Sequence, residues 1–196
     1  CGSIERVYAV KGVADELIAK VVEKTRRLRQ GDPLAAATDV GPMTTAEQRD
    51  FVDAQVREAL AQGATALTGG EKPVAKGYWF PPTVLVGATH AMRVMREETF
   101  GPVLPIVVVD GLDEAIALAN DSEFGLTASG WTRSTKTAQK LVEELRAGTV
   151  TINDHLFSFG EPTATWGGLG KSGIGRSHGV HGLMELVNVK HVSVDL

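Results

Sequence analysis

Apolar and polar positions along this chain follow two different periods. Short runs rich in β-branched and aromatic residues, which are typical of strands, alternate with longer stretches in which apolar residues recur at helical spacing. We expect strands at 5–10, 64–67, 79–86 (interrupted by Pro81 and Pro82), 104–109, 126–132 and 149–153. We expect helices at 13–28, 112–120, 134–146 and 178–186, and one more that starts at Thr44 and ends before Gly63. This alternation predicts an α/β fold with a mostly parallel sheet flanked by helices.

Capping and burial patterns refine several of these elements. Thr44 precedes Glu47 by three residues, a capping-box spacing that predicts a helix start. Gly63 follows the last apolar position of the same helix, where glycine commonly ends a helix. The continuous apolar run at 104–109 predicts a strand buried on both faces. In the helix at 134–146, the residues expected to face inward are Ala138, Leu141, Val142 and Leu145.

The last forty residues have a different character. Residues 157–175 form a long stretch rich in Gly, Ser, Thr and Pro, and long loops in compact domains are usually functional. After the short helix, residues 187–194 alternate between apolar and polar types. We therefore expect a terminal strand in the segment 187–196. It would pair with a sheet of this chain or of a neighbouring subunit.

Composition narrows the class of function. The 196 residues are 43% hydrophobic and 22% charged, which suits an ordinary globular protein. The net charge of −4 and the scattered basic residues argue against a nucleic-acid partner. No apolar run reaches the ~18 residues of a membrane span, so we expect no membrane partner. A single cysteine excludes an intrachain disulfide and favours the cytoplasm. Because the chain starts at Cys1, we expect it to be cut from something longer.

Cys1 is the first candidate for chemistry. A lone cysteine is more often a small buried hydrophobic residue than a nucleophile, and a terminal one can be a remnant of cloning. Its context favours catalysis, because residues 1–10 (CGSIERVYAV) resemble the active-site signature of aldehyde dehydrogenases. In that signature the nucleophilic cysteine lies five residues before an arginine, here Arg6.

A second motif lies at 96–103 (REETFGPV). Taken alone, it indicates a charged turn followed by Gly-Pro. It also resembles the Glu-Glu-x-Phe-Gly-Pro motif of the same family. The resemblance implies that Glu98 binds the ribose hydroxyls of NAD or NADP and that Phe100 packs beside the nicotinamide. A carboxylate can accept two hydrogen bonds from a diol, so the role suits the residue type.

A third pair of segments completes the resemblance. Residues 147–153 and 166–176 are similar to the strand and glycine-rich segment that border the family's substrate loop. A glycine-rich stretch alone would suggest a phosphate-binding loop. The chain departs from the family pattern at Trp166, where phenylalanine is usual, and at Ser177, where glutamate is common. The resemblance implies an aldehyde pocket drawn from 155–166, with Phe157, Phe159 and Trp166 as candidates. We expect no metal site, because the His178 and His181 pair has no third ligand in view.

The resemblance covers the whole chain. It identifies residues 1–186 as the C-terminal catalytic portion of an NAD(P)-dependent aldehyde dehydrogenase, without the dinucleotide-binding domain. It implies oxidation of an aldehyde through a thiohemiacetal and a thioester on Cys1, and a homo-oligomer (dimer or tetramer) that uses the terminal strand. The oxyanion asparagine and the water-activating glutamate belong to the missing part, so the fragment alone is expected to be inactive. Two alternatives stay open: a CoA-acylating relative, and a non-catalytic oligomerisation fragment.

Overall fold

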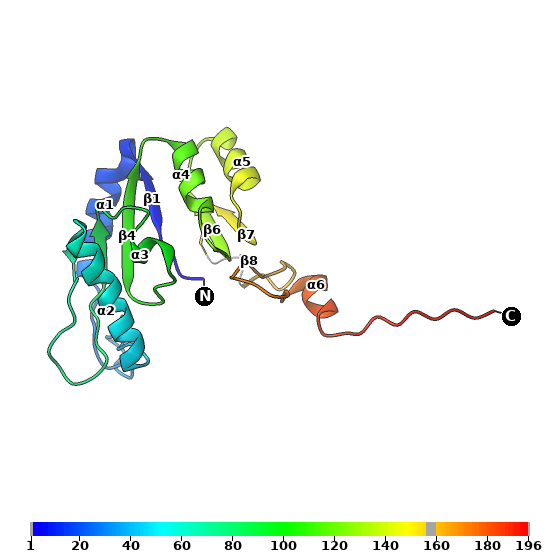
Figure 1. Ribbon diagram of the computed structural model, residues 1–196, viewed down its shortest axis with the longest axis horizontal. Coiled ribbons are helices and arrows are strands. Elements are labelled where there is room, and N and C mark those ends of the chain that lie inside the picture. Colours follow the sequence, from blue (N-terminus) through cyan, green and yellow to red (C-terminus); the bar gives the residue numbers. More distant parts are fainter. Residues whose placement is uncertain (1, 156–159, 196) are drawn as a thin grey trace. The chain divides into compact units, whose positions relative to one another are not determined.

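A four-stranded sheet organises the first half of the chain (Figure 1). The computed structural model describes residues 2–155 and 160–195, which divide into two compact units, one running from Ser3 to Leu118 and one from Ala119 onward. In the first unit the strand order is β1-β4-β3-β2. The strands are β1 (Val7–Val10), β2 (Thr65–Thr68), β3 (Thr83–Val86) and β4 (Val103–Val109). Both β1 and β3 pair with β4 in parallel, while β2 pairs with β3 antiparallel, which confirms the mostly parallel sheet.

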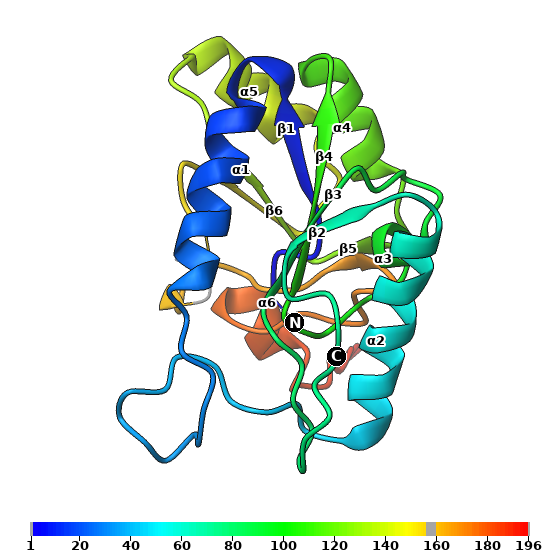
Figure 2. The same ribbon diagram turned by 90° about the vertical axis from the view of Figure 1, so that its left-hand side faces the viewer.

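Helices cover both faces of this sheet, as Figure 2 shows for α1 and α2. The helices of this unit are α1 (Lys11–Arg26), α2 (Ala46–Ala61), α3 (Arg93–Arg96) and α4 (Leu112–Asn120), whose last two residues belong to the second unit. Because neighbouring strand side chains point to opposite faces, Val84 packs with α1 while Leu85 packs with α2 and α3. Each face therefore has its own apolar cluster. Leu85 and Ile106 are fully buried, one in each cluster.

The second unit is a smaller βαβ arrangement. Strands β6 (Thr127–Gly130) and β7 (Thr149–Ile152) pair in parallel, and the intervening helix is α5 (Thr135–Glu144). The short strands β5 (Phe124–Gly125) and β8 (Leu169–Gly170) pair antiparallel. A short helix, α6 (Gly179–Met184), follows. The predicted division into residues 1–186 and 187–196 stays a prediction.

Two local predictions need correction. Thr45, not Thr44, caps α2: its hydroxyl accepts a hydrogen bond of 3.2 Å from the backbone N–H of Gln48. Adjacent threonines offer the same cap, and the chain enters the helix only after the second. The strand expected at 79–86 with an interruption at Pro81 and Pro82 forms only after these prolines, from Thr83, because proline lacks the N–H of a sheet ladder.

Two burial predictions were also wrong. Val142 on α5 is 53% exposed, so the apolar face of that helix is narrower than its sequence suggests. Val108 on β4 is 45% exposed, whereas the next residue, Val109, is 1% exposed. Because neighbouring side chains of a strand point to opposite faces, the end of β4 is covered on one face and open on the other.

The terminal segment forms no strand within the described part of the chain. Residues 188–195 have no assigned secondary structure, and Val189, Val192 and Val194 are 86%, 67% and 70% exposed. Pairing of this segment with the chain's own sheets is therefore not seen. None of the helices in the described ranges combines the length and apolar character needed to cross a membrane.

The buried cluster on the α2 face predicts a large cost for losing a side chain there. Replacing the fully buried Leu85 with alanine should lower the free energy of unfolding by about 2–5 kcal/mol, because the cavity cannot close completely. Urea denaturation followed by circular dichroism measures this change. The matched control is Leu34→Ala at a position 92% exposed, which should shift stability by less than about 0.5 kcal/mol. Equal losses in both variants would contradict the assignment of this core.

Candidate active site

The candidate site in the first unit lies at the amino ends of β1 and β4. Because these strands run parallel, with Val7 opposite Ile106, the segments that precede them meet at one edge of the sheet. One of these segments is the cysteine motif and the other contains Glu98 and Phe100. Cys1 itself lies outside the described residues. Open parallel sheets usually bind ligands beyond the carboxyl ends of their strands, so this site uses the opposite edge.

Thr99 anchors the turn that carries both predicted cofactor residues. Its backbone N–H donates to Oε2 of Glu5 at 3.0 Å, and its carbonyl accepts from Nε2 of Gln48 at 2.8 Å. Thr99 is only 1% exposed. Two side chains from distant segments therefore fix the backbone of one buried residue. Sequence reasoning missed both Glu5 and Gln48, because no local pattern marks a side chain that binds a turn elsewhere.

Glu98 and Phe100 flank this anchor and are both exposed. Phe100 is 54% exposed and has a φ of +47°. This left-handed conformation costs a residue with a side chain roughly 1–2 kcal/mol. The N–H of Phe100 donates to Oε1 of Glu5 at 3.3 Å, which helps to hold it there. The structure thus brings the two predicted cofactor residues together on one turn and leaves both side chains accessible.

The electrostatics of Glu5 follow from its position. Burial raises the pKa of its carboxyl group, and the nearby negative charge of Glu98 adds to this rise. The two backbone N–H donors of Thr99 and Phe100 act in the opposite direction. Burial has the largest effect, so the pKa of Glu5 is raised overall, and burying the ionised carboxylate costs solvation free energy.

Glu97, the first glutamate of the Glu-Glu pair, has a different environment. It accepts hydrogen bonds from Nε of Arg93 at 3.0 Å and from Nε2 of the buried Gln55 at 3.1 Å. The hydrogen bond from Arg93 lowers the pKa of Glu97. Glu97 is therefore engaged with α2 and α3, whereas Glu98 extends from the surface.

Arg6, the arginine of the cysteine motif, belongs to a polar network. Its Nη1 donates to the Tyr8 hydroxyl at 3.3 Å, and that hydroxyl donates to the carbonyl of Leu118 at 3.2 Å. Nδ1 of His90 lies 3.2 Å from the same hydroxyl, and its Nε2 lies 3.0 Å from Nη1 of Arg96. An arginine can only donate, so Nε2 accepts and the proton of a neutral His90 is on Nδ1. The network ties the cysteine motif to α3 and α4.

A shallow hollow of about 220 Å³ adjoins the same edge of the sheet. Ser3 and Ile4 of the cysteine segment line it, together with Gly101 and Pro102 from the turn after Phe100. The two motifs of this unit therefore border one surface depression.

In the second unit, the two departures from the family pattern face each other. Trp166 and Ser177 form an antiparallel bridge, with N–H to carbonyl distances of 2.8 Å in both directions. Side chains of such a pair lie on the same face of the two segments. A residue larger than the usual phenylalanine is thus paired with one smaller than the usual glutamate. Phe157 and Phe159, the other predicted pocket residues, lie outside the described residues.

The polar side chains of the glycine-rich segment serve the fold. Lys171 binds Glu123 with an Nζ to Oε2 distance of 2.6 Å, and Oγ of Ser172 accepts from the N–H of Gly125 at 3.0 Å. Both contacts hold β8 beside β5. These contacts give Lys171 and Ser172 a structural role that needs no bound phosphate.

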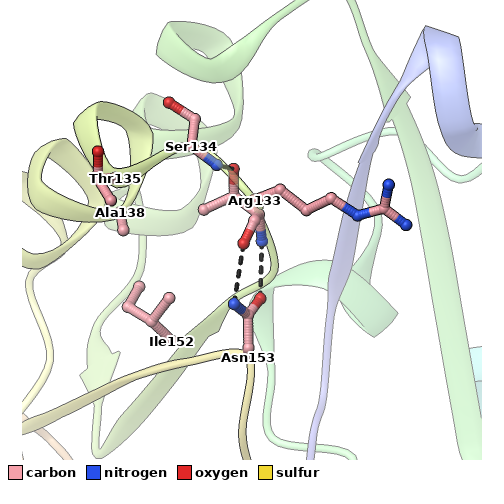
Figure 3. Close-up of a pocket in the computed structure, with 7 residues that line it drawn as sticks. Arg133, Ser134, Thr135, Ala138, Ile152 and Asn153 are labelled. Carbon is pink, nitrogen blue, oxygen red and sulfur yellow. Dashed lines mark hydrogen bonds between the residues drawn. The ribbon is translucent and has the colours of Figure 1, made fainter.

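A second hollow opens beside the first turn of α5, as Figure 3 shows. Asn153, with a φ of +56°, spans it by two hydrogen bonds of 2.8 Å to the backbone of Thr132. The other lining residues are Arg133, Ser134, Thr135, Ala138 and Ile152. Trp166, the predicted pocket residue of this unit that the structure describes, does not line it. Within 2–155 and 160–195, no group of three His, Asp or Glu residues could hold a metal ion.

A model of the aldehyde dehydrogenase family matches residues 1–192. This chain belongs to the aldehyde dehydrogenase family. It is 41% identical over 192 residues to an aldehyde dehydrogenase of Paenarthrobacter nicotinovorans, covering 98% of this chain and 42% of that protein. It is 39% identical over 187 residues to a putative NADP(+) succinate-semialdehyde dehydrogenase of Mycobacterium ulcerans, covering 94% of this chain and 36% of that protein.

Solved structures of the family show the same fold. Lactaldehyde dehydrogenase from Escherichia coli matches with a TM-score of 0.90 and 39% identity, over 94% of this chain and 39% of that one. Betaine aldehyde dehydrogenase from Staphylococcus aureus, in complex with NAD+, matches with a TM-score of 0.86 and 34% identity, over 92% of this chain and 36% of that one. The chain thus spans about two fifths of the length of these relatives.

The close approach of Gly148 to Gly167 predicts a strict size limit in this aldehyde dehydrogenase chain. A Cβ at Gly148 would lie 1.7 Å from the carbonyl oxygen of Gly167, and backbone cannot move aside as a side chain does. Gly148→Ala should therefore lower the free energy of unfolding by about 1–3 kcal/mol or more, as measured by chemical denaturation.

The matched control for this variant is Gly160→Ala. Gly160 belongs to the same unit, and a Cβ there would meet no atom of the described residues within 4 Å. This variant should be close to neutral. A neutral Gly148→Ala would show that residues 147–153 and 166–176 do not pack as described.

Proposed function

We propose that this chain is the catalytic portion of a longer enzyme that oxidises an aldehyde to a carboxylic acid with NAD+ or NADP+. Membership of the family supports the reaction class. The observation that carries the proposal is the turn at Thr99. It exposes Glu98 and Phe100 at the sheet edge where the segment that follows Cys1 also enters β1.

The proposed chemistry is covalent. The thiolate of Cys1 attacks the carbonyl carbon of the aldehyde and forms a thiohemiacetal. Departure of a hydride from that carbon leaves a thioester on the same sulfur. Water then attacks the thioester, which releases the acid and restores the thiol. The nicotinamide cofactor, when bound, supplies the acceptor for the hydride.

The exposed turn fits such a cofactor. The carboxylate of Glu98 can accept hydrogen bonds from both hydroxyls of a ribose, and Phe100 offers an exposed apolar ring next to it. The names of the relatives also support a nicotinamide cofactor, because one is described with NADP(+) and another was solved with NAD+. We therefore propose Glu98 and Phe100 as cofactor-binding residues and leave the choice of dinucleotide open.

The proposed substrate is a small-molecule aldehyde, in the cytoplasm. Phe157, Phe159 and Trp166 are the proposed pocket residues, and their aromatic rings would favour apolar parts of a substrate. The oxyanion donor and the water-activating carboxylate would come from residues that precede Cys1 in the longer enzyme. The 196-residue chain alone should therefore lack dehydrogenase activity.

This proposal is tested in the longer enzyme and in the 196-residue chain. In the longer enzyme, Cys1→Ser should abolish aldehyde-dependent formation of reduced cofactor, measured by absorbance. Glu98→Gln should raise the KM for the dinucleotide about tenfold or more, because an uncharged amide loses charged hydrogen bonds to the diol. The isolated chain should form no reduced cofactor.

The matched control is Glu71→Gln, which removes one exposed carboxylate elsewhere in the first unit and should leave the KM unchanged. Full activity of Cys1→Ser would overturn the covalent mechanism, and activity of the isolated chain would overturn its dependence on upstream residues. Turnover only with CoA, giving an acyl-CoA product, would favour the acylating alternative.

We also propose that residues 187–196 pair with a second copy of the enzyme. The support is their alternating pattern together with the exposure of Val189, Val192 and Val194, which would be costly to leave in water along one strand. Pairing with a neighbouring subunit would satisfy both the apolar side chains and the backbone. A homodimer or homotetramer would result.

Association should depend on the apolar positions of this segment. Val189→Asp should increase the monomer fraction at micromolar concentration, because a charge would have to be buried at the interface. Analytical ultracentrifugation measures this fraction. Asn188→Asp adds the same charge at a neighbouring polar position and should have a much smaller effect. Identical sedimentation of both variants and the unmodified protein would exclude this segment from the interface.

A further inference from the structure

The carboxylate of Glu5 receives two successive backbone N–H groups. Oε2 accepts from Thr99 at 3.0 Å and Oε1 accepts from Phe100 at 3.3 Å. Two successive N–H groups that meet one carboxylate form a small anion-binding concavity of the backbone, and the left-handed φ of Phe100 follows directly after it. Glu5 thus binds the turn as an anion would.

The residues that the carboxylate holds are the ones that set the geometry of the turn. Thr99 is buried and offers its peptide groups to Glu5 and Gln48. Phe100 adopts a backbone conformation that it would not keep alone. A shift of either peptide would redirect the side chains of Glu98 and Phe100, which extend from the surface on either side of Thr99.

We propose that Glu5 is a positioning residue for cofactor binding: its carboxylate locks the turn at Thr99 and Phe100 and so sets where Glu98 and Phe100 meet the nicotinamide ribose. This inference rests on the proposed function. Glu5 acts through the backbone of the turn and does not touch the cofactor itself.

A purely stabilising role for Glu5 conflicts with its electrostatics. Burial raises its pKa above the ordinary value of 4.5, and the negative charge of Glu98 raises it further. For a group with a raised pKa, the stability it contributes is present below the unfolded value and is lost as pH rises through the folded one. At neutral pH the ionised carboxylate is therefore less favourable to the fold than its protonated form, and an uncharged isostere avoids the cost of burying a charge. Positioning of the turn gives a reason for a charge at this place.

The decisive variant is Glu5→Gln, which keeps the shape of the side chain and replaces one acceptor oxygen with a donor. In the 196-residue chain, amide hydrogen exchange at Thr99 and Phe100 should become about tenfold faster, because each N–H loses part of a charged hydrogen bond. The free energy of unfolding at pH 7 should not fall. In the unmodified chain, the amide proton shifts of these two residues should titrate with a midpoint above 4.5, and this titration should vanish in the variant.

The functional arm uses the longer enzyme. Glu5→Gln should raise the KM for the dinucleotide several-fold while leaving the KM for the aldehyde nearly unchanged. The matched control is Glu23→Gln, which removes an exposed carboxylate on α1 and should alter neither exchange at Thr99 and Phe100 nor the KM.

The outcomes separate this inference from the function on which it rests. Unchanged amide exchange at Thr99 and Phe100 in Glu5→Gln would show that the Glu5 carboxylate does not hold the turn. Faster exchange with an unchanged KM would overturn its role in cofactor positioning. If the unmodified enzyme bound no dinucleotide at all, the proposed function would fail and the positioning role with it, whereas the exchange result would still establish or refute the lock on the turn.

Discussion

The parallel pairing of β1 with β4 is the constraint on which the candidate site depends. Two strands that run in the same direction bring their preceding segments to the same edge, although nearly a hundred residues separate them in the chain. Glu5 can reach Thr99 only because this register holds. The apolar clusters on the two faces of the sheet stabilise the pairing of β1 with β4. The packing that forms the core therefore also positions the candidate site.

The turn before β4 shows how a buried anchor can present exposed groups. The peptide groups of Thr99 are satisfied by Glu5 and Gln48, which allows that residue to be buried without an orphaned backbone. Its neighbours, Glu98 and Phe100, then have no structural task in the described core and extend outward. Glu97 turns the other way and joins Arg93 and Gln55. Of residues 97–100, Glu97 and Thr99 thus support the fold. Glu98 and Phe100 form an accessible surface.

In the second unit, close backbone contact takes the place of a large core. Gly148 lies against Gly167, and the Trp166 and Ser177 bridge lies next to this contact in the chain. Only glycines allow two main chains to approach so closely, which gives a physical reason for glycine at positions 148 and 167. Lys171 and Ser172 then bind β5 and its preceding residue. The segment is therefore a packed support and does not resemble a phosphate-binding loop.

The sequence alone determined the order of the longer strands and helices along the chain, the mostly parallel sheet and the three motifs that indicate the family, but not the short elements α3, β5 and β8. These features are local: hydrophobic periodicity, glycine positions and short residue patterns can be read within a few turns of chain. Glu98 and Phe100 could be named for the same reason, because they lie within one motif. Their arrangement as exposed neighbours of a buried Thr99 could not.

The tertiary structure decided every feature that joins distant segments. The strand order β1-β4-β3-β2 places Glu5 beside Thr99, and the fold of the second unit pairs Trp166 with Ser177. It also decided which of two adjacent threonines caps α2 and which side chains of α5 are exposed, such as Val142. A residue pattern records which groups are present, whereas pairing energies between distant segments decide which of them meet.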